Sequence, residues 1–218
     1  MNLWTFWLDT LRGLVDILSS EAGMGLGLAI ITATLLIRVL LLPISWSAAY
    51  RGCIRQKKMM KLQPELRKLK DKYAAKPDVY MQQMRELYGK HELSFIDGKS
   101  LLGGLAQMPL FLGMFQALRN VGEGARFLWV PNLLRPDTLF ALIAGATTAL
   151  MIVANPDLPE QMRLLLIVVP SVIAIVAALN FCSALSLYWV ASNCFSAVQT
   201  VAVHFVVARR LRAGKLKI

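Results

Sequence analysis

Long apolar runs separated by short polar segments dominate the chain. A helix rises about 1.5 Å per residue, so roughly 20 apolar residues cross the hydrocarbon core of a bilayer, which is about 30 Å thick. The pattern predicts an all-α polytopic membrane protein with a core of five transmembrane helices. The predicted spans cover residues 23–49, 100–119, 138–155, 162–180 and 183–208.

The segments outside these spans have patterns of their own. Residues 1–22 place apolar and polar side chains on opposite faces of a helix, which predicts an interfacial amphipathic helix. A cleaved signal peptide is the alternative, but the basic residues that open such a peptide are missing. The other predicted segments are a cytoplasmic basic helical hairpin at 50–99, an external loop at 120–137, a cytoplasmic loop at 156–161 and a basic cytoplasmic tail at 209–218.

The hairpin prediction rests on apolar residues that recur at alternating three- and four-residue intervals over residues 59–73 and again over 80–91. Lys76-Pro77-Asp78 interrupts this spacing and marks the turn. Pro64, within the first arm, predicts a kink or a fresh helix start. The outer faces carry many lysines, which suit solvent, anionic lipid headgroups, ribosomal RNA or acidic partners.

The composition fits a membrane protein: 56% of the residues are hydrophobic, the formal net charge is +11 and the mean hydropathy is +0.54. A basic nucleic-acid-binding protein would share the charge but not the apolar runs. Residues 51–99 hold thirteen basic and six acidic residues, and residues 209–217 hold five basic and none acidic. Because Lys and Arg accumulate on the cytoplasmic side, the N-terminus is predicted outside and the C-terminus inside. Two acidic residues at 156–161 count against this orientation.

The cysteines and histidines predict no metal, cofactor or catalytic site. Cys53, Cys182 and Cys194 lack the spacing of metal ligands or of a disulfide framework, and we interpret them as small apolar fillers. His91 and His204 lie far apart and outside the motifs of hydrolases. An intramembrane protease, or another membrane enzyme, is therefore not expected.

Arg38 lies in the middle of the first predicted span, too far from either surface for its side chain to reach the headgroups. A charge inside a membrane is costly, and it marks a functional site by default when it faces water or a partner. The alternative is a structural ion pair with a carboxylate on another span. None of the five predicted spans contains Asp or Glu, which favours a functional arginine.

Polar residues of the spans line up with this arginine. At 100° per residue, those of the last span fall on one face of its helix, while Thr34 and Ser45 share a face with Arg38. We predict a polar groove, although hydrogen bonding between packed helices is the alternative for each residue taken alone. The predicted groove residues are Thr34, Arg38, Ser45, Gln107, Tyr188, Trp189, Ser192, Asn193, Ser196, Gln199 and Thr200.

Four short motifs in this order resemble the YidC/Oxa/Alb family of membrane protein insertases, and the resemblance runs over nearly the whole chain. They are IRVLLLPI at residues 37–44, LQPEL at 62–66, QMPLF at 107–111 and LYWVASN at 187–193. The family fold implied is a five-helix core around a hydrophilic groove that opens to the cytoplasm and to lipid. Arg38, Gln107 and Trp189 match the groove residues of the family, whereas residues 94–101 depart from its pattern.

The resemblance implies an insertase and chaperone that moves short polar flanks of nascent membrane proteins through the groove and releases their apolar segments into lipid. Nascent membrane proteins and membrane lipids are then the partners, with a translocation channel or a ribosome as further candidates and no specific nucleic acid. A bacterial inner membrane is the expected location. Flexible methionines of the hairpin are predicted to capture substrate: Met59, Met60, Met81 and Met84.

A small transporter that uses Arg38 as a mid-membrane substrate site is the alternative function. Transporters of that kind commonly contain internal repeats, and we find no matching halves in this chain.

Overall fold

The computed structural model describes residues 2–74, 76–90, 107–119 and 124–216. Within these ranges the regular structure is helical, apart from one isolated bridge between Phe127 and Val130. The α-helices are α1 (Leu3–Asp16), α2 (Leu26–Leu40), α3 (Leu42–Lys72), α4 (Pro77–Lys90), α6 (Gln107–Leu118), α7 (Thr138–Val153), α8 (Arg163–Asn180) and α9 (Ser183–Arg212). A π-helical turn, Ile17–Glu21, follows α1, and a 3₁₀ turn, Glu160–Met162, precedes α8. Predictions for residues 91–106 and 120–123 lie outside the described residues.

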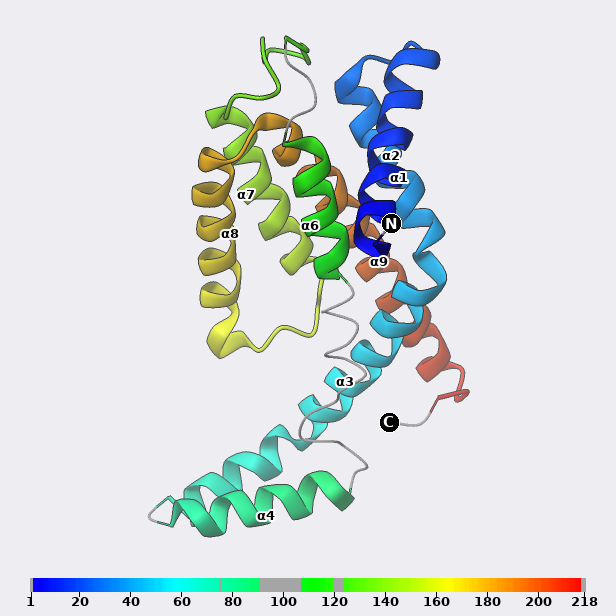
Figure 1. The fold of residues 1–218 in the computed structure, drawn as a ribbon. Coiled ribbons are helices and arrows are strands. Elements are labelled where there is room, and N and C mark those ends of the chain that lie inside the picture. The colour runs from blue at the N-terminus through cyan, green and yellow to red at the C-terminus, as the bar shows by residue number, and fades with distance from the viewer. Residues whose placement is uncertain (1, 75, 91–106, 120–123, 217–218) are drawn as a thin grey trace.

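The helices form an upright bundle from which a helical hairpin projects (Figure 1). α7 packs against both α8 and α9, and α2 packs against α9. The second half of α3 extends away from the bundle and pairs with α4 beside it. α3 ends at Lys72 and α4 begins at Pro77, within the Lys76-Pro77-Asp78 segment that interrupts the sequence pattern. α8 ends at Asn180 and α9 begins at Ser183, so a two-residue connection divides the long uncharged stretch.

Two described helices, α8 and α9, are long and apolar enough to cross a membrane by themselves. The bent pair α2 and α3 makes a third candidate if it is counted as one span, and α7 and the described part of α6 are shorter apolar helices. The protein is therefore an all-helical membrane protein with two or three clear spanning candidates among the described residues. A core of five spans stays a prediction.

The first predicted span is bent. The pattern predicts one helix over residues 23–49, but α2 ends at Leu40 and α3 begins at Leu42, with 66° between their axes. Pro43 explains the break, because it has no N–H for the helical hydrogen bond and its ring would clash with the carbonyl of Val39. By contrast, no new helix starts at Pro64, and α3 continues through it.

The main core lies where α1, α2, α6 and α9 meet. Leu11 and Val15 of α1 are each 1% exposed, and they belong to one cluster with Met114 of α6, Ile30 of α2 and Tyr188 of α9. The apolar face of the predicted amphipathic helix thus packs on α6 and α2. Its polar contacts also go to α6, since Nε1 of Trp4 donates to Oε1 of Gln116 over 3.2 Å.

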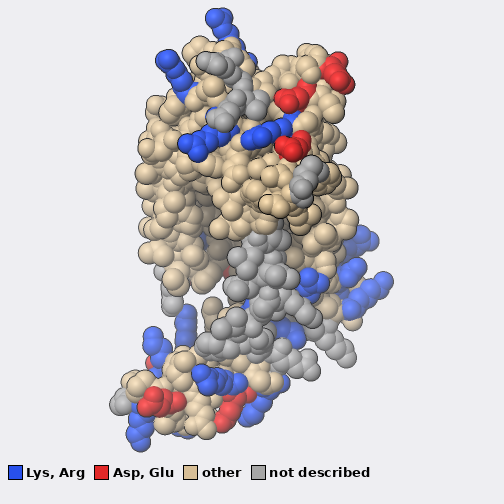
Figure 2. Space-filling view, viewed as in Figure 1, with Lys and Arg blue, Asp and Glu red and all other residues tan. Residues whose placement is uncertain are grey.

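Outward-facing apolar residues surround much of the bundle. Leu164 and Ile173 of α8 are 76% and 60% exposed, and Val198 and Phe205 of α9 are 71% and 68% exposed. On the face shown in Figure 2, charged residues gather at the ends of the molecule and on the hairpin, with few in the broad central band. Exposed apolar side chains in such a band suit contact with lipid.

Gly145 allows α7 and α8 to approach closely. A Cβ at this position would lie 2.3 Å from Cγ1 of Ile175 and 3.2 Å from the backbone oxygen of Ser171. We expect Gly145→Leu to destabilise the protein by roughly 1–3 kcal/mol, as overpacking commonly does. Thermal unfolding of the purified protein in detergent measures this. Gly52→Leu on α3, where a Cβ meets nothing within 4 Å, is the matched control and should have little effect; equal losses for both variants would contradict the close approach.

Candidate functional site

Arg38 lies between α2 and α9 and is 8% exposed. Its Nη2 donates a hydrogen bond to the hydroxyl of Ser192 on α9. Within the described part of the chain, no carboxylate forms an ion pair with it. The arginine also sits in the last turn of α2, where the helix dipole favours a positive charge.

Several buried polar atoms of α2 and α9 have no hydrogen-bond partner among the described residues. They are Nε of Arg38 and the hydroxyls of Ser186 and Tyr188. Tyr188 lies one helical turn before Ser192 on α9 and is 2% exposed. Buried polar groups in native proteins are nearly always satisfied by protein or by ordered water. A water-filled site beside Arg38 would satisfy Nε of Arg38 and the hydroxyl of Tyr188.

A second polar contact joins α3 and α9. Nε2 of Gln199 donates to Oγ of Ser45 over 3.3 Å, and the hydroxyl of Ser45 lies 3.4 Å from Oε1 of Gln199. Seven residues separate Ser192 from Gln199, which corresponds to about 10.5 Å along α9. The polar face predicted for the last span therefore contacts α2 and α3 in succession.

Other predicted groove residues form hydrogen bonds to a neighbouring helix or within their own helix. Nδ2 of Asn193 donates to Oγ1 of Thr148 on α7 over 2.8 Å, and both side chains are buried. Thr34 donates to the carbonyl of Ile30 in its own helix over 2.7 Å, and Thr200 donates likewise to Ser196 over 2.8 Å. These hydroxyls and this amide have the partners that ordinary helix packing would give them.

Aromatic contacts join α6 to the same part of α9. The ring of Phe111 lies 5.6 Å from that of Trp189, edge to face, and 6.5 Å from that of Tyr188. Gln107 is the first residue of α6, but its side chain lies outside the described part. The structure thus brings Arg38, Tyr188 and Ser192 together and positions Trp189 beside α6.

The hairpin carries its methionines on or near its surface. Met59, Met60 and Met81 are 37%, 41% and 40% exposed, and Met84 is half-buried. A cavity of about 720 Å³ separates the hairpin from the α7–α8 connection. Its lining includes Met60, Leu66 and Tyr80 of the hairpin and Leu158 and Pro159 of the connection.

A further polar cluster lies at the base of the hairpin, and the sequence analysis missed it. Nζ of Lys57 lies 2.8 Å from Oδ2 of Asp157, Nδ1 of His204 lies 3.4 Å from the same oxygen, and Sγ of Cys53 lies 3.4 Å from Nδ1 of His204. The one available signal was Asp157 itself, an acidic residue in a loop predicted to be cytoplasmic. The negative charge of its carboxylate compensates the positive charge of Lys57, which lies 100 residues earlier in the chain.

Comparison with known proteins identifies similar chains. The model of a family described as 60Kd inner membrane protein matches residues 17–209. The chain is 35% identical over 203 residues to membrane protein insertase MisCA of Bacillus subtilis, covering 87% of this chain and 74% of that protein. It is 37% identical over 207 residues to membrane protein insertase YidC 1 of Halalkalibacterium halodurans, covering 87% of this chain and 73% of that protein. Membrane protein insertase YidC of Oceanobacillus iheyensis is 31% identical over 220 residues, covering 93% of this chain and 84% of that protein.

Proposed function

Because the chain belongs to the 60Kd inner membrane protein family, and relatives are named membrane protein insertases, we propose how it acts as one. Short polar flanks of nascent membrane proteins enter a polar groove beside Arg38, and the apolar segments leave sideways into lipid. The insertase function and the membrane location follow from the relatives. The relatives do not favour a small transporter.

One observation carries the groove: Arg38 is buried between α2 and α9 with no carboxylate partner among the described residues. An unpaired charge in hydrocarbon costs several kcal/mol. Water, or the acidic flank of a substrate, would remove that cost. The buried hydroxyl of Tyr188 supports the same environment.

The work of such a groove is physical and needs no chemical reaction. A polar flank that crosses hydrocarbon loses its hydration, whereas a hydrated recess shortens the dry path that it must cross. The positive charge of Arg38 attracts acidic flanks, and this attraction is stronger at reduced dielectric than in bulk water. Once the flank has crossed, burial of the apolar segment in lipid favours release by about 25 cal/mol per Å².

The orientation follows from charge. In this proposal, the basic hairpin and the basic C-terminal end of α9 lie in the cytoplasm, and the N-terminus lies on the other side of the membrane. The ion pair of Asp157 with Lys57 also supports it, because an acid that neutralises a hairpin lysine can sit in a cytoplasmic loop. The membrane of this proposal is the bacterial inner membrane, which the description of the matching family, 60Kd inner membrane protein, supports.

The hairpin receives substrate first in this proposal. Exposed methionines adapt to apolar segments of different shape. The cavity beside Met60 and Tyr80 supplies space next to them. A translocation channel or a ribosome can deliver the segment to this end of the bundle.

Access of water to the groove can be measured by cysteine labelling. In a background without the three native cysteines, we expect cysteines at Ser196 and Gln199 to react with a membrane-impermeant thiol reagent added from the cytoplasmic side. Cysteines at Val198 and Val201, which are 71% and 56% exposed on the outer face of the same helix, should stay unreacted inside lipid. Equal labelling of the two pairs would mean that the polar face is not a groove wall.

A further inference from the structure

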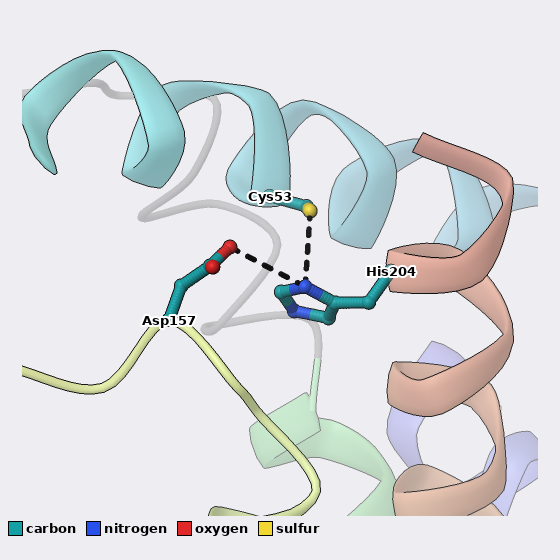
Figure 3. Close-up of side chains that lie close together, drawn as sticks. All are labelled: Cys53, Asp157 and His204. Carbon is teal, nitrogen blue, oxygen red and sulfur yellow. Dashed lines mark hydrogen bonds and ion pairs between the residues drawn. The ribbon is translucent and has the colours of Figure 1, made fainter. Parts of the chain in front are cut away.

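Cys53, Asp157 and His204 converge from three separate parts of the fold, outside the proposed groove (Figure 3). Cys53 lies on α3, His204 lies on α9, and Asp157 lies in the connection between α7 and α8. One ligand atom of each residue lies within 4.8 Å of those of the other two. Cys53 is 2% and Asp157 8% exposed. We propose that these three side chains bind a divalent transition-metal ion with the ligand preference of Zn²⁺.

The distances fit a tetrahedral ion. Nitrogen, oxygen and sulfur ligands at about 2.0–2.3 Å from a tetrahedral zinc ion lie about 3.3–3.7 Å from one another. The observed separations are 3.4 Å between Sγ of Cys53 and Nδ1 of His204, and 3.4 Å between that nitrogen and Oδ2 of Asp157. The third pair, Sγ of Cys53 and the carboxylate of Asp157, lies within 4.8 Å, so an ion between the three atoms would require these two to approach each other by up to about 1.5 Å. A fourth position remains for water, as in sites with three protein ligands.

Asp157 supplies a second, independent observation. Its Oδ2 is buried and has no hydrogen bond of good geometry among the described residues, although Nζ of Lys57 lies 2.8 Å away. Lys57 also donates to Oδ1 over 2.9 Å. An ion at Oδ2 would replace the ammonium there, and Lys57 would keep its bond to Oδ1. Such outer contacts orient ligating carboxylates in metal sites.

The backbone around Asp157 is already held in place. Nε2 of Gln56 donates to the carbonyl of Asp157 over 2.7 Å, and Nδ2 of Asn155 donates to Oε1 of Gln56 over 3.1 Å. The N–H of Asp157 donates to Oδ1 of Asn155 over 3.0 Å. The thiol of Cys53 loses its proton to solvent when the ion binds, and the neutral imidazole of His204 donates an electron pair.

A bound ion would connect α3, α9 and the α7–α8 connection at the base of the hairpin. His204 lies twelve residues after Ser192, which is about 18 Å along α9 from the contact with Arg38. The ion would therefore brace the junction between the bundle and the hairpin. This inference does not depend on the insertase proposal, because binding is measured without any substrate.

Cobalt titration tests the site. The full chain, purified with a tag free of histidine and stripped with a chelator, is titrated with Co²⁺ and then with Zn²⁺. We expect about one Co²⁺ per chain with a thiolate-to-cobalt absorption band, and displacement of the cobalt by zinc. Cys53→Ser should remove the band, and His204→Asn should weaken binding by more than about 100-fold, the upper range for loss of a mere outer-shell partner.

The matched control is a variant with Cys182→Ser and Cys194→Ser, which removes the other two thiols and should bind as the wild type does. Absence of the thiolate band from wild-type protein overturns the proposal, whatever the variants do. So does a band that survives Cys53→Ser, because another thiol would then be the ligand. If the wild-type protein shows no such band, the three side chains only form ion-pair and hydrogen-bond contacts between α3, α9 and the α7–α8 connection.

Discussion

Arg38→Ala is expected to lose most of the insertion of substrates with acidic flanks, with the protein still folded. The charge has no carboxylate partner among the described residues, so its removal leaves no buried acid unpaired. Two opposite charges 4 Å apart attract by about 4 kcal/mol at an effective dielectric of 20. Since about 1.4 kcal/mol changes a rate tenfold, even a third of this attraction predicts a loss of at least about tenfold. Protease protection of a translocated flank measures insertion.

Two further variants separate charge from shape at the same position. Arg38→Lys should retain much of the insertion because it keeps the positive charge. Arg38→Gln keeps a polar side chain but removes the charge, and it should fail as alanine does. If the glutamine variant inserts acidic-flanked substrates as well as the wild type, the charge has no part in the mechanism.

Replacing the four hairpin methionines with glutamine is expected to reduce capture of substrate several-fold while the bundle keeps its stability. Glutamine has a similar length but is polar, so it removes the apolar contact that a nascent segment would make with Met59, Met60, Met81 and Met84. The hairpin projects from the bundle, so the change should leave the main core intact (Figure 1). Crosslinking of nascent chains to the hairpin, with thermal unfolding measured in parallel, reports both effects.

Lys68→Gln combined with Lys76→Gln is the matched control on the hairpin, because both side chains are exposed and neither lies in the methionine set. The control should capture substrate almost as well as the wild type. Should the lysine variant lose capture and the methionine variant keep it, electrostatic attraction rather than apolar contact would be the basis of capture.

The positions of helices could be predicted from periodicity where the pattern depends on the residues of a single helix. The division between α8 and α9 was predictable, because an uncharged stretch between Arg163 and Arg209 exceeds one span. The bend at Leu41 was not predictable, because the apolar run continues through it and the run alone does not reveal that Pro43 breaks the helix. For Arg38, the sequence predicted only that it lines one groove together with the polar face of the last span. It did not predict which residue of α9 Arg38 contacts.

Partners of individual polar residues could not be predicted from one helix. A helical wheel puts Asn193 and Ser192 on the same face, yet Ser192 bonds Arg38 of α2 and Asn193 bonds Thr148 of α7. Likewise, the contact of Asp157 with Lys57 joins residues 100 positions apart. Such pairs depend on how helices pack against one another, which local spacing does not encode.

Site-specific photocrosslinking from the groove to a ribosome-held nascent membrane protein tests the central claim most directly. A photoreactive residue at Ser196 should crosslink to the polar flank of the nascent chain, while one at Phe205, on the outer face of the same helix, should crosslink to lipid or to the apolar segment alone. Crosslinks from Phe205 to the flank, with none from Ser196, would contradict the passage of polar flanks through a groove beside Arg38.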